Sequence, residues 1–356
     1  MLRKTHIEGE KHMSHFMSNS NLIVKSIFVA VLFCSQATAQ SSQYFKHDLT
    51  PPPSPWVGKV MDDNSKKFTF ALFSDLNGGE RDHIFEVAAA QLALLKPDFV
   101  VSIGDLIDGG TEDQEQLLKE WDSFDKRAEK AGAPIFRVGG NHDLTNVKMR
   151  EVWAERYGPR YYHFVYSDVL FLILDSEDFS EERMQEIYFA REAAIKVMDG
   201  PNPKAAETML YSQMIEADFG EISDAQSDYF KKVLAENSDV KWTFLFMHKP
   251  TWKREDGRGL ERIEAALKGR SYTVFNGHDH SLSYRVINDM DYIMLGTTGG
   301  GQDASDDNSF DHLTLITMDP SGPSISHIKM EGILDKTGNV PENGNDICYQ
   351  KSKCGK

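Results

Sequence analysis

Cysteine is scarce in this chain of 356 residues, with three in all, so the fold must rest on a packed core rather than on a disulfide framework. Long hydrophobic runs are also absent: no segment reaches the roughly 18 consecutive apolar residues that a membrane-spanning helix needs. Basic residues are outnumbered, with 39 Lys and Arg against 55 Asp and Glu, and the formal net charge is −16. Such a surface repels polyanions, which argues against non-specific binding to nucleic acid or to anionic membranes.

The first 39 residues differ in character from the rest of the chain. Lys25 precedes the apolar run 27–33, and Ala37-Thr38-Ala39 gives the small-x-small pattern of a cleaved secretory signal peptide. We therefore expect a secreted or periplasmic protein, with cleavage after Ala39. This segment carries four basic and two acidic side chains, so the remaining residues have a formal net charge of −18. In an oxidising compartment Cys348 and Cys354 could close a small terminal loop.

The remaining composition, 40% hydrophobic and 26% charged over the whole chain, suits one large globular domain or two small ones. After the signal peptide at 1–39 we expect a proline-rich lead-in at 40–65, a globular domain at 66–335 and a tail at 336–356. Residues 178–220 are predicted to be a largely helical insertion whose role the sequence leaves open.

Three strand–loop–helix units follow one another in the first half of the domain. Buried strands are predicted at 68–73, 99–103 and 134–138, each ending in a polar loop. Thr111 and Gln114 resemble a capping box at the start of the second helix. Such units indicate an α/β layer architecture, in which ligands bind outside the carboxyl ends of the strands. The polar loops should therefore meet at one rim.

The second half adds further strands that end in polar residues. Segments 161–166 and 169–174 predict a hairpin, and Ser223 with Gln226 suggests a capping box that starts a helix. The strand at 241–247 delivers His248, and the strand at 272–275 ends at Asn276-Gly277-His278-Asp279-His280.

Five strand ends thus present carboxylate, amide or imidazole groups. A lone Asp or His after a strand is usually a cap or a structural residue, but five such ends are hard to explain by capping alone. Carboxylate oxygen and imidazole nitrogen are the ligands that divalent metals such as Mn, Fe or Zn accept. The number of candidate donors is enough for two metal ions, and these are Asp75, Asp105, Asn141, His142, His248, His278 and His280.

As a set, these motifs resemble those of the calcineurin-like metallophosphoesterase superfamily. They stand here, in order, as Asp75-Leu76-Asn77, Gly104-Asp105-Leu106-Ile107-Asp108, Gly140-Asn141-His142-Asp143, His248 and Gly277-His278-Asp279-His280, across roughly residues 68–300. The resemblance implies a four-layer α/β/β/α sandwich over residues 66–335, with a dimetal site at the carboxyl ends of the strands. It implies hydrolysis of small-molecule phosphate mono- or diesters by a hydroxide shared between the metals.

The resemblance also implies a role for each matching residue. Asp75, Asp105 and His280 would hold the first metal, and Asp105 would bridge to a second metal held by Asn141, His248 and His278. His142 would donate a proton to the leaving oxygen, and Asp143 would orient its imidazole. Asp108 would hold a neighbouring ligand in place from outside the coordination sphere.

One position departs from the family pattern, because Asn77 stands where a histidine is usual. Its amide oxygen could ligate the first metal as a weaker, neutral donor, or Asn77 could only cap a turn. An alternative function follows: a phosphate-ester binding or scaffold protein with a weakened first metal site. Arg81, Arg254 and Arg258 are candidate substrate contacts, although charged loop residues are more often solvated. A close-approach turn at 299–301 near the metals is also expected.

Overall fold

The computed structural model describes residues 45–48, 55–57, 67–256 and 258–354, all within the unit from Ser41 to Lys356. The expected signal peptide and most of the lead-in lie outside these residues, so the domain boundaries drawn from the sequence stay predictions. None of the helices in the described ranges is long and apolar enough to cross a membrane.

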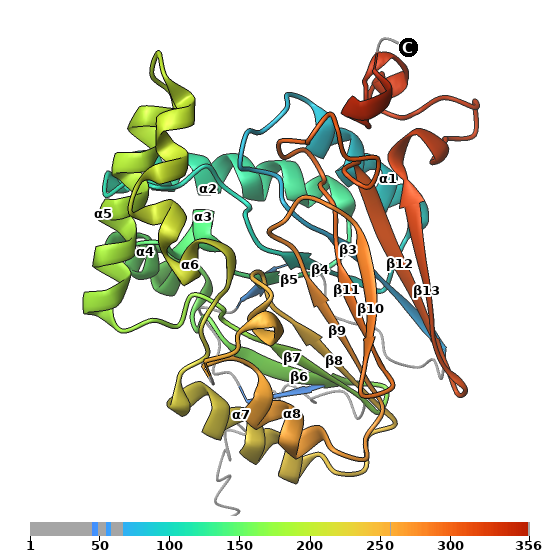
Figure 1. The fold of residues 1–356 in the computed structure, drawn as a ribbon. Helices are drawn as coiled ribbons and strands as arrows, with labels where there is room; N and C mark the ends of the chain where they lie inside the picture. Colours follow the sequence, from blue (N-terminus) through green and yellow to red (C-terminus); the bar gives the residue numbers. More distant parts are fainter. Residues whose placement is uncertain (1–44, 49–54, 58–66, 257, 355–356) are drawn as a thin grey trace, which may run out of the picture. The chain divides into compact units, whose positions relative to one another are not determined.

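Two β-sheets form the centre of this unit (Figure 1). The first sheet has the strand order β13-β12-β3-β4-β5-β2, and the second has the order β1-β6-β7-β8-β9-β11-β10. The strands are β1 (Phe45–His47), β2 (Trp56–Val57), β3 (Phe68–Phe73), β4 (Phe99–Ile103), β5 (Ile135–Val138), β6 (Tyr162–Tyr166), β7 (Val169–Ile173), β8 (Trp242–Phe246), β9 (Tyr272–Asn276), β10 (Ser283–Ile287), β11 (Met290–Met294), β12 (His312–Asp319) and β13 (Gly322–Lys329).

Parallel strands occupy the middle of each sheet, and antiparallel strands complete the edges. Strands β3, β4 and β5 are parallel in the first sheet, as are β7, β8, β9 and β11 in the second. The carboxyl ends of parallel strands lie at the same edge of a sheet, where loops can converge on a ligand. The predicted hairpin is confirmed as the antiparallel pair β6–β7.

Helices cover the outer face of each sheet. Helices α1, α2 and α4 pack on the first sheet, and α7 and α8 pack on the second (Figure 1). This arrangement is the four-layer α/β/β/α sandwich that the motifs predict. The α-helices are α1 (Ile84–Leu95), α2 (Gln114–Ala128), α3 (Asn141–Leu144), α4 (Val147–Tyr157), α5 (Glu181–Met198), α6 (Ile215–Asp218), α7 (Asp224–Glu236) and α8 (Glu261–Leu267). Short 3₁₀ helices are η1 (Glu129–Ala131), η2 (Pro203–Thr208), η3 (Tyr211–Gln213), η4 (Thr251–Lys253), η5 (Met330–Gly332), η6 (Gly344–Asp346) and η7 (Lys351–Lys353).

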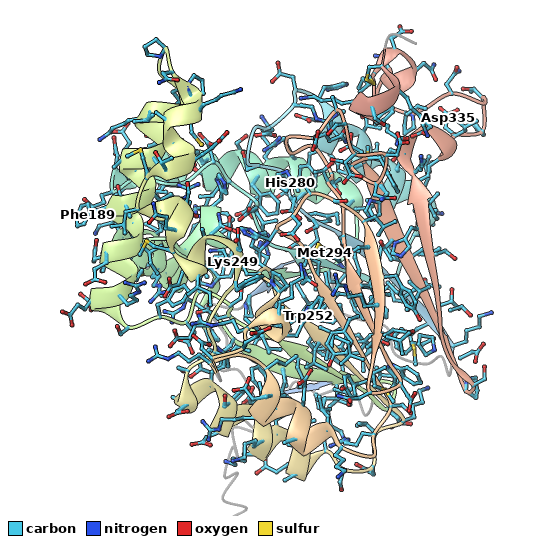
Figure 2. All side chains as sticks on the ribbon, viewed as in Figure 1. Phe189, Lys249, Trp252, His280, Met294 and Asp335 are labelled. Atoms are coloured by element: carbon cyan, nitrogen blue, oxygen red, sulfur yellow. A yellow bond between two sulfur atoms is a disulfide. The ribbon has the colours of Figure 1, made fainter. Side chains whose placement is uncertain are left out.

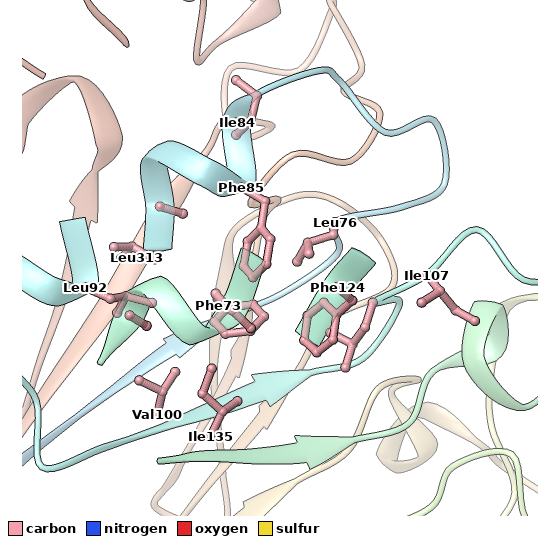
Figure 3. Packing of buried hydrophobic residues seen from close by; sticks show 14 of the residues in the cluster. Phe73, Leu76, Ile84, Phe85, Leu92, Val100, Ile107, Phe124, Ile135 and Leu313 are labelled. Atoms are coloured by element: carbon pink, nitrogen blue, oxygen red, sulfur yellow. The ribbon is translucent and has the colours of Figure 1, made fainter. Parts of the chain in front are cut away.

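The core is divided by the sheets, and β7 shows how one strand serves two layers. Phe171 and Ile173 pack between the two sheets, whereas Leu170 and Leu172 pack beneath α7 and α8. Both faces are apolar, so the sequence reads as a continuous hydrophobic run. Outside the first sheet, Phe85 of α1 stacks on Phe124 of α2 at 5.6 Å between ring centroids (Figure 3).

The observed N-caps of the helices agree only in part with those predicted from the sequence. The N-cap of α2 is Asp113, whose carboxylate accepts from two backbone N–H groups of the first turn, so the predicted box of Thr111 and Gln114 is wrong. Ser223 does cap α7 through the N–H of Gln226 at 3.2 Å. The region 40–65 was expected to be an extended, proline-rich lead-in, and strands β1 and β2 within it were not predicted, because each is defined only by pairing with a distant strand.

Candidate metal centre

Four strand ends from the two sheets bring carboxylates and imidazoles together. Asp75 follows β3, Asp105 follows β4, His248 follows β8, and His278 and His280 follow β9. They form two groups, Asp75–Asp105–His280 and Asp105–His248–His278, in each of which one ligand atom per residue lies within 4.8 Å of the others. Asp105 belongs to both groups, so its carboxylate is placed to bridge two cations.

Backbone carbonyls fix the histidines of the second group. The Nδ1–H of His248 donates to Ile103 O at 2.8 Å, which leaves Nε2 facing Asp105 Oδ2 at 3.1 Å. The Nε2–H of His278 donates to Ala217 O at 2.9 Å, which leaves Nδ1 as its free lone pair. A hydrogen bond from the other ring nitrogen is the usual support of a metal-ligating histidine.

The first group is supported in the same way. The Nδ1–H of His280 donates to Gly301 O at 2.6 Å, and its Nε2 lies 3.3 Å from Asp75 Oδ1. Asp75 also accepts the backbone N–H of His278 at 3.0 Å, which joins the loops after β3 and β9. The expected turn at 299–301 therefore lies beside this group and supplies one of its supports.

Close backbone approach makes this packing possible. A Cβ on Gly104 would lie 2.6 Å from His248 Nδ1, and one on Gly140 would lie 2.3 Å from Asp105 Oδ1. Asp75 and Asp105 themselves have φ values of 54° and 55°. Non-glycine residues seldom adopt this left-handed region, and where they do so at neighbouring sites the strain usually serves function.

Unpaired buried atoms test whether these residues fit metal ions. Asn141 Oδ1 has no hydrogen-bond partner among the described residues although Asn141 is 5% exposed, and the Nε2 of the fully buried His248 faces only the carboxylate of Asp105, at 3.1 Å. A buried polar atom left unpaired is costly, and a bound cation would give Asn141 Oδ1 a partner. The donor set of carboxylate, amide and imidazole also suits a divalent ion. The residues therefore fit two cations.

The electrostatics of the metal-free site are dominated by its two carboxylates. Burial opposes the charge of Asp105, but His248 and His142 outweigh it and hold the pKa of that carboxyl well below its usual range. Burial likewise disfavours the charge of His248, yet Asp105 raises the pKa of the imidazole to about 10. Despite burial, the hydrogen bond and charge of Asp75 raise the pKa of His280 to about 9.

The expected pairing of Asp143 with the ring of His142 is wrong. The Nδ1–H of His142 donates to Asp108 O at 2.8 Å, and its Nε2 accepts from Arg191 Nη2 at 3.1 Å, so both ring nitrogens are taken. Asp143 instead accepts the backbone N–H of Gly140 at 2.8 Å and two further N–H groups of the loop after β4. Asp143 shapes the loops, and Asp108 supports His142 through its carbonyl.

Asn77 lies beside the site without a visible ligand role. It is 1% exposed, and its backbone N–H donates to Asp105 O at 3.1 Å. Its side-chain Nδ2 has no partner among the described residues. Metal binding by Asn77 stays a prediction.

Arg81, expected as a possible substrate contact, is engaged elsewhere. Its guanidinium donates to both carboxylate oxygens of Asp311 at 2.6 and 2.7 Å, and to the carbonyls of Gly300 and Cys348. Cys348 and Cys354 form a disulfide. Arg81 therefore ties the C-terminal loop to the turn that supports the first group.

The other two arginines singled out in the sequence are also paired. Arg254 forms an ion pair with Asp256 and donates to Gly220 O at 3.1 Å. Arg258 has a side chain that is 64% exposed and lies 3.4 Å from Glu221. Both stabilise the loop after β8.

Residues 178–220 reach the site at three points that the sequence did not reveal. Ala217 of α6 holds His278, and Glu216 O accepts from the buried Lys249 at 2.8 Å. Arg191 of α5 contacts His142. Lys249 and His280 both lie in the central part of the view (Figure 2). The position of Lys249 directly after His248 was a usable signal, but Arg191 sits in mid-helix and gave none.

Comparisons with known proteins agree with this geometry. The sequence model of the calcineurin-like phosphoesterase family matches residues 68–282. A serine/threonine-protein phosphatase, CPPED1 of Bos taurus, is 35% identical over 94 residues, which cover 23% of this chain and 28% of the relative. The match thus spans less than a third of that relative's length.

A solved structure shares the fold. The dimetal phosphatase LOC 393393 of Danio rerio superposes with a TM-score of 0.51 at 15% sequence identity. The superposition covers 74% of this chain and 96% of the other. Most of the zebrafish chain therefore has a counterpart in this fold.

Proposed function

This chain belongs to the calcineurin-like phosphoesterase family, and from that premise we propose that it is a dimetal-dependent hydrolase of phosphate mono- or diesters. One observation carries the proposal: two groups of candidate metal ligands, buried except for the partly exposed His278 and His280, share the single carboxylate of Asp105. A shared carboxylate is the expected way to hold two cations close enough to act on one phosphoryl group.

Two divalent cations would fit the residues described. The first would be held by Asp75, Asp105 and His280, and by Asn77 if its amide ligates; the second would be held by Asp105, Asn141, His248 and His278. When bound, such ions polarise phosphoryl oxygens and lower the pKa of water. Mn, Fe and Zn all accept this mixture of oxygen and nitrogen donors.

The charge of the site favours phosphate esters. Two divalent cations would bring four positive charges against the two negative charges of Asp75 and Asp105. The pocket would then be positive within a chain of formal net charge −16. A local positive site of this kind attracts and orients anionic substrates despite the acidic surface.

His142 is the proposed proton donor to the leaving oxygen. Its Nδ1–H is fixed on Asp108 O, so Nε2 is the atom that can exchange a proton. In the structure Nε2 accepts from Arg191, and burial together with Arg191 lowers the pKa of His142. The imidazole can therefore carry a proton at Nε2 only when the guanidinium of Arg191 donates elsewhere.

Hydrolysis of two chromogenic esters tests the proposal. The chain is stripped of metal, reloaded with Mn, and assayed with p-nitrophenyl phosphate and with bis(p-nitrophenyl) phosphate. We expect Mn-dependent hydrolysis of at least one ester, and at least a roughly hundredfold loss in Asp105→Asn, which removes the shared ligand. A phosphoserine peptide is a third substrate, because the bovine relative is named as a serine/threonine-protein phosphatase.

The alternative of a binding or scaffold protein gives a different result in the same assay. If the chain binds its metal ions normally but hydrolyses none of the three substrates, phosphate-ester binding replaces hydrolysis as the function. If it neither binds metal nor hydrolyses any of them, both functions fail.

We also propose that the chain is exported and cleaved after Ala39. The pattern of Lys25, the apolar run 27–33 and the small residues at 37–39 supports this. The disulfide between Cys348 and Cys354 is consistent with an oxidising compartment. N-terminal sequencing of the protein from its native host should begin at Gln40; a mature protein that retains residues 1–39 would contradict export by this route.

A further inference from the structure

Arg191 is a buried guanidinium at the edge of the candidate metal centre. It lies on α5, is 6% exposed, and its Nη2 donates to His142 Nε2 at 3.1 Å. A Cβ on Gly110 would lie 2.9 Å from its Nη1, so the loop after β4 passes directly under the guanidinium. Arg191 thus contacts the site from a helix that carries none of the motif residues.

The charge of Arg191 is poorly balanced. Among the described residues, the nearest carboxylate is that of Glu192, whose Oε1 lies 3.9 Å from Nη1, beyond hydrogen-bond distance. Arg183 on the same helix differs, because it donates to the carboxylates of both Glu186 and Glu216. A guanidinium has five N–H donors, and an ion pair at 3.9 Å without a hydrogen bond compensates its buried charge only in part. An anionic ligand would supply the negative charge that the side chains around Arg191 do not provide.

The guanidinium of Arg191 lies next to the candidate ligands of the first metal. The space that a Cβ on Gly78 would fill lies 3.2 Å from His280 Nε2 and 3.8 Å from His142 Nε2. The two imidazoles therefore border one small space that the glycine keeps open. Arg191 donates to the Nε2 atom on one side of that space, so its guanidinium lies where a phosphoryl group bound by the metal centre would be in reach.

Helix α5 is held in place by the same segment that supports the second metal group. Arg183 of α5 pairs with Glu216 of α6 at 2.9 Å, and Glu216 O accepts from Lys249, the residue after His248. The neighbouring Ala217 O holds His278. Glu216 and Ala217 thus fix the end of this segment to the site, and the ion pair of Arg183 with Glu216 holds α5 to it, which gives Arg191 a defined position.

We propose that Arg191 is a substrate-binding residue whose guanidinium donates to the non-bridging oxygens of a phosphate monoester and favours monoesters over diesters. The inference rests on the proposed function and adds a substrate class to it. A monoester carries a second negative charge and a third non-bridging oxygen that a diester lacks, and the planar fork of arginine matches two such oxygens. On binding, Arg191 exchanges its bond to His142 for bonds to the substrate.

The test compares Arg191→Gln with Lys196→Gln, a control that removes one positive charge from an exposed position on the same helix. Binding of inorganic phosphate to the Mn-loaded protein is measured by titration calorimetry, and kcat and KM are measured for the mono- and bis-p-nitrophenyl esters. Loss of a charged hydrogen bond should weaken phosphate binding by about tenfold or more in Arg191→Gln. The ratio of kcat/KM for monoester over diester should fall by a similar factor, and Lys196→Gln should stay within about twofold of wild type.

Several outcomes would overturn the inference. A folded Arg191→Gln chain with the phosphate affinity and ester ratio of Lys196→Gln would show that Arg191 only supports His142. If Arg191→Gln does not fold, Arg191→Lys takes its place: it keeps the charge and loses the fork, and an unchanged ester ratio would then refute fork binding. Wild-type protein that binds no phosphate refutes the inference outright, whereas wild-type protein that binds phosphate but hydrolyses neither ester refutes the proposed function and leaves the binding comparison decisive.

Discussion

Replacement of Gly104 by alanine should disable the second metal group through a single methyl group. The added Cβ would lie 2.6 Å from His248 Nδ1 and 2.9 Å from His248 Cβ. The ring cannot move away freely, because it is 0% exposed and its Nδ1–H is bonded to Ile103 O. His248 must therefore rotate or shift, and its Nε2 leaves Asp105.

The magnitude has two parts. A non-glycine residue in the left-handed region costs about 1–2 kcal/mol, and Gly104 has a φ of +91°. Overpacking of a rigid interior adds about 1–3 kcal/mol. The sum of about 2–5 kcal/mol lowers Tm by about 4–10 °C, since a domain of this size loses about 2 °C per kcal/mol.

Gly269→Ala is the matched control. Gly269 has a similar φ of +82°, and its added Cβ would meet nothing within 4 Å. The free energy of unfolding of Gly269→Ala should fall only by the cost of the backbone conformation, about 1–2 kcal/mol. This variant should still bind its metal ions. Thermal unfolding with bound-metal analysis checks both variants: Gly104→Ala should lose one of two ions. If Gly104→Ala matches Gly269→Ala in Tm and binds as much metal as wild type, the packing argument is wrong.

Three further predictions concern single residues of the site. His142→Asn should reduce turnover by about two or more orders of magnitude with metal content intact, and most for esters with poor leaving groups; equal losses for good and poor leaving groups would refute proton donation. Asn77→His should tighten binding of the first ion without abolishing hydrolysis, and an unchanged calorimetric isotherm would count against Asn77 as a ligand. In the metal-free chain, Asp75 raises the pKa of His280 to about 9 despite its burial, so the stability from this charge is fully present below about pH 6.5 and lost as the pH rises through about 9. Thermal melts across this range should show that loss, and His280→Asn should remove it; an identical slope in the variant would contradict the pairing with Asp75.

The candidate ligands at the strand ends could be predicted from the sequence because each is a local feature. A buried strand such as 68–73 or 99–103 has a clear apolar pattern, and the residue after it has a defined place at the rim. Because these strand ends meet at one rim, the proximity of Asp75, Asp105 and His248 can be predicted without knowing any distance between them. The α/β layer architecture follows from the same regularity, since strands and helices alternate along much of the chain, whereas the four-layer arrangement was predicted from the resemblance to the metallophosphoesterase motifs.

Contacts between distant segments could not be predicted in this way. The tautomer of His142 depends on Asp108 O and Arg191, not on its neighbour Asp143. Every residue has a backbone carbonyl, so the sequence cannot show which one accepts this hydrogen bond. The pairing of Arg81 with Asp311 could not be predicted for the same reason, because the two residues lie 230 positions apart in the sequence. Sequence patterns identify which side chains are chemically suited to a site, whereas packing decides which of them are already paired.

The carboxylate of Asp105 is proposed to join two metal sites. Comparing the metal content of wild type with that of Asp105→Asn tests this most directly. Both proteins are stripped, reloaded with Mn, freed of excess metal and analysed by mass spectrometry of the element. The shared position of Asp105 in both ligand groups predicts two ions per chain in wild type and loss of both in Asp105→Asn. An Asp105→Asn chain that retains two ions, or a wild-type chain that binds none, would contradict shared ligation of two metal ions by Asp105.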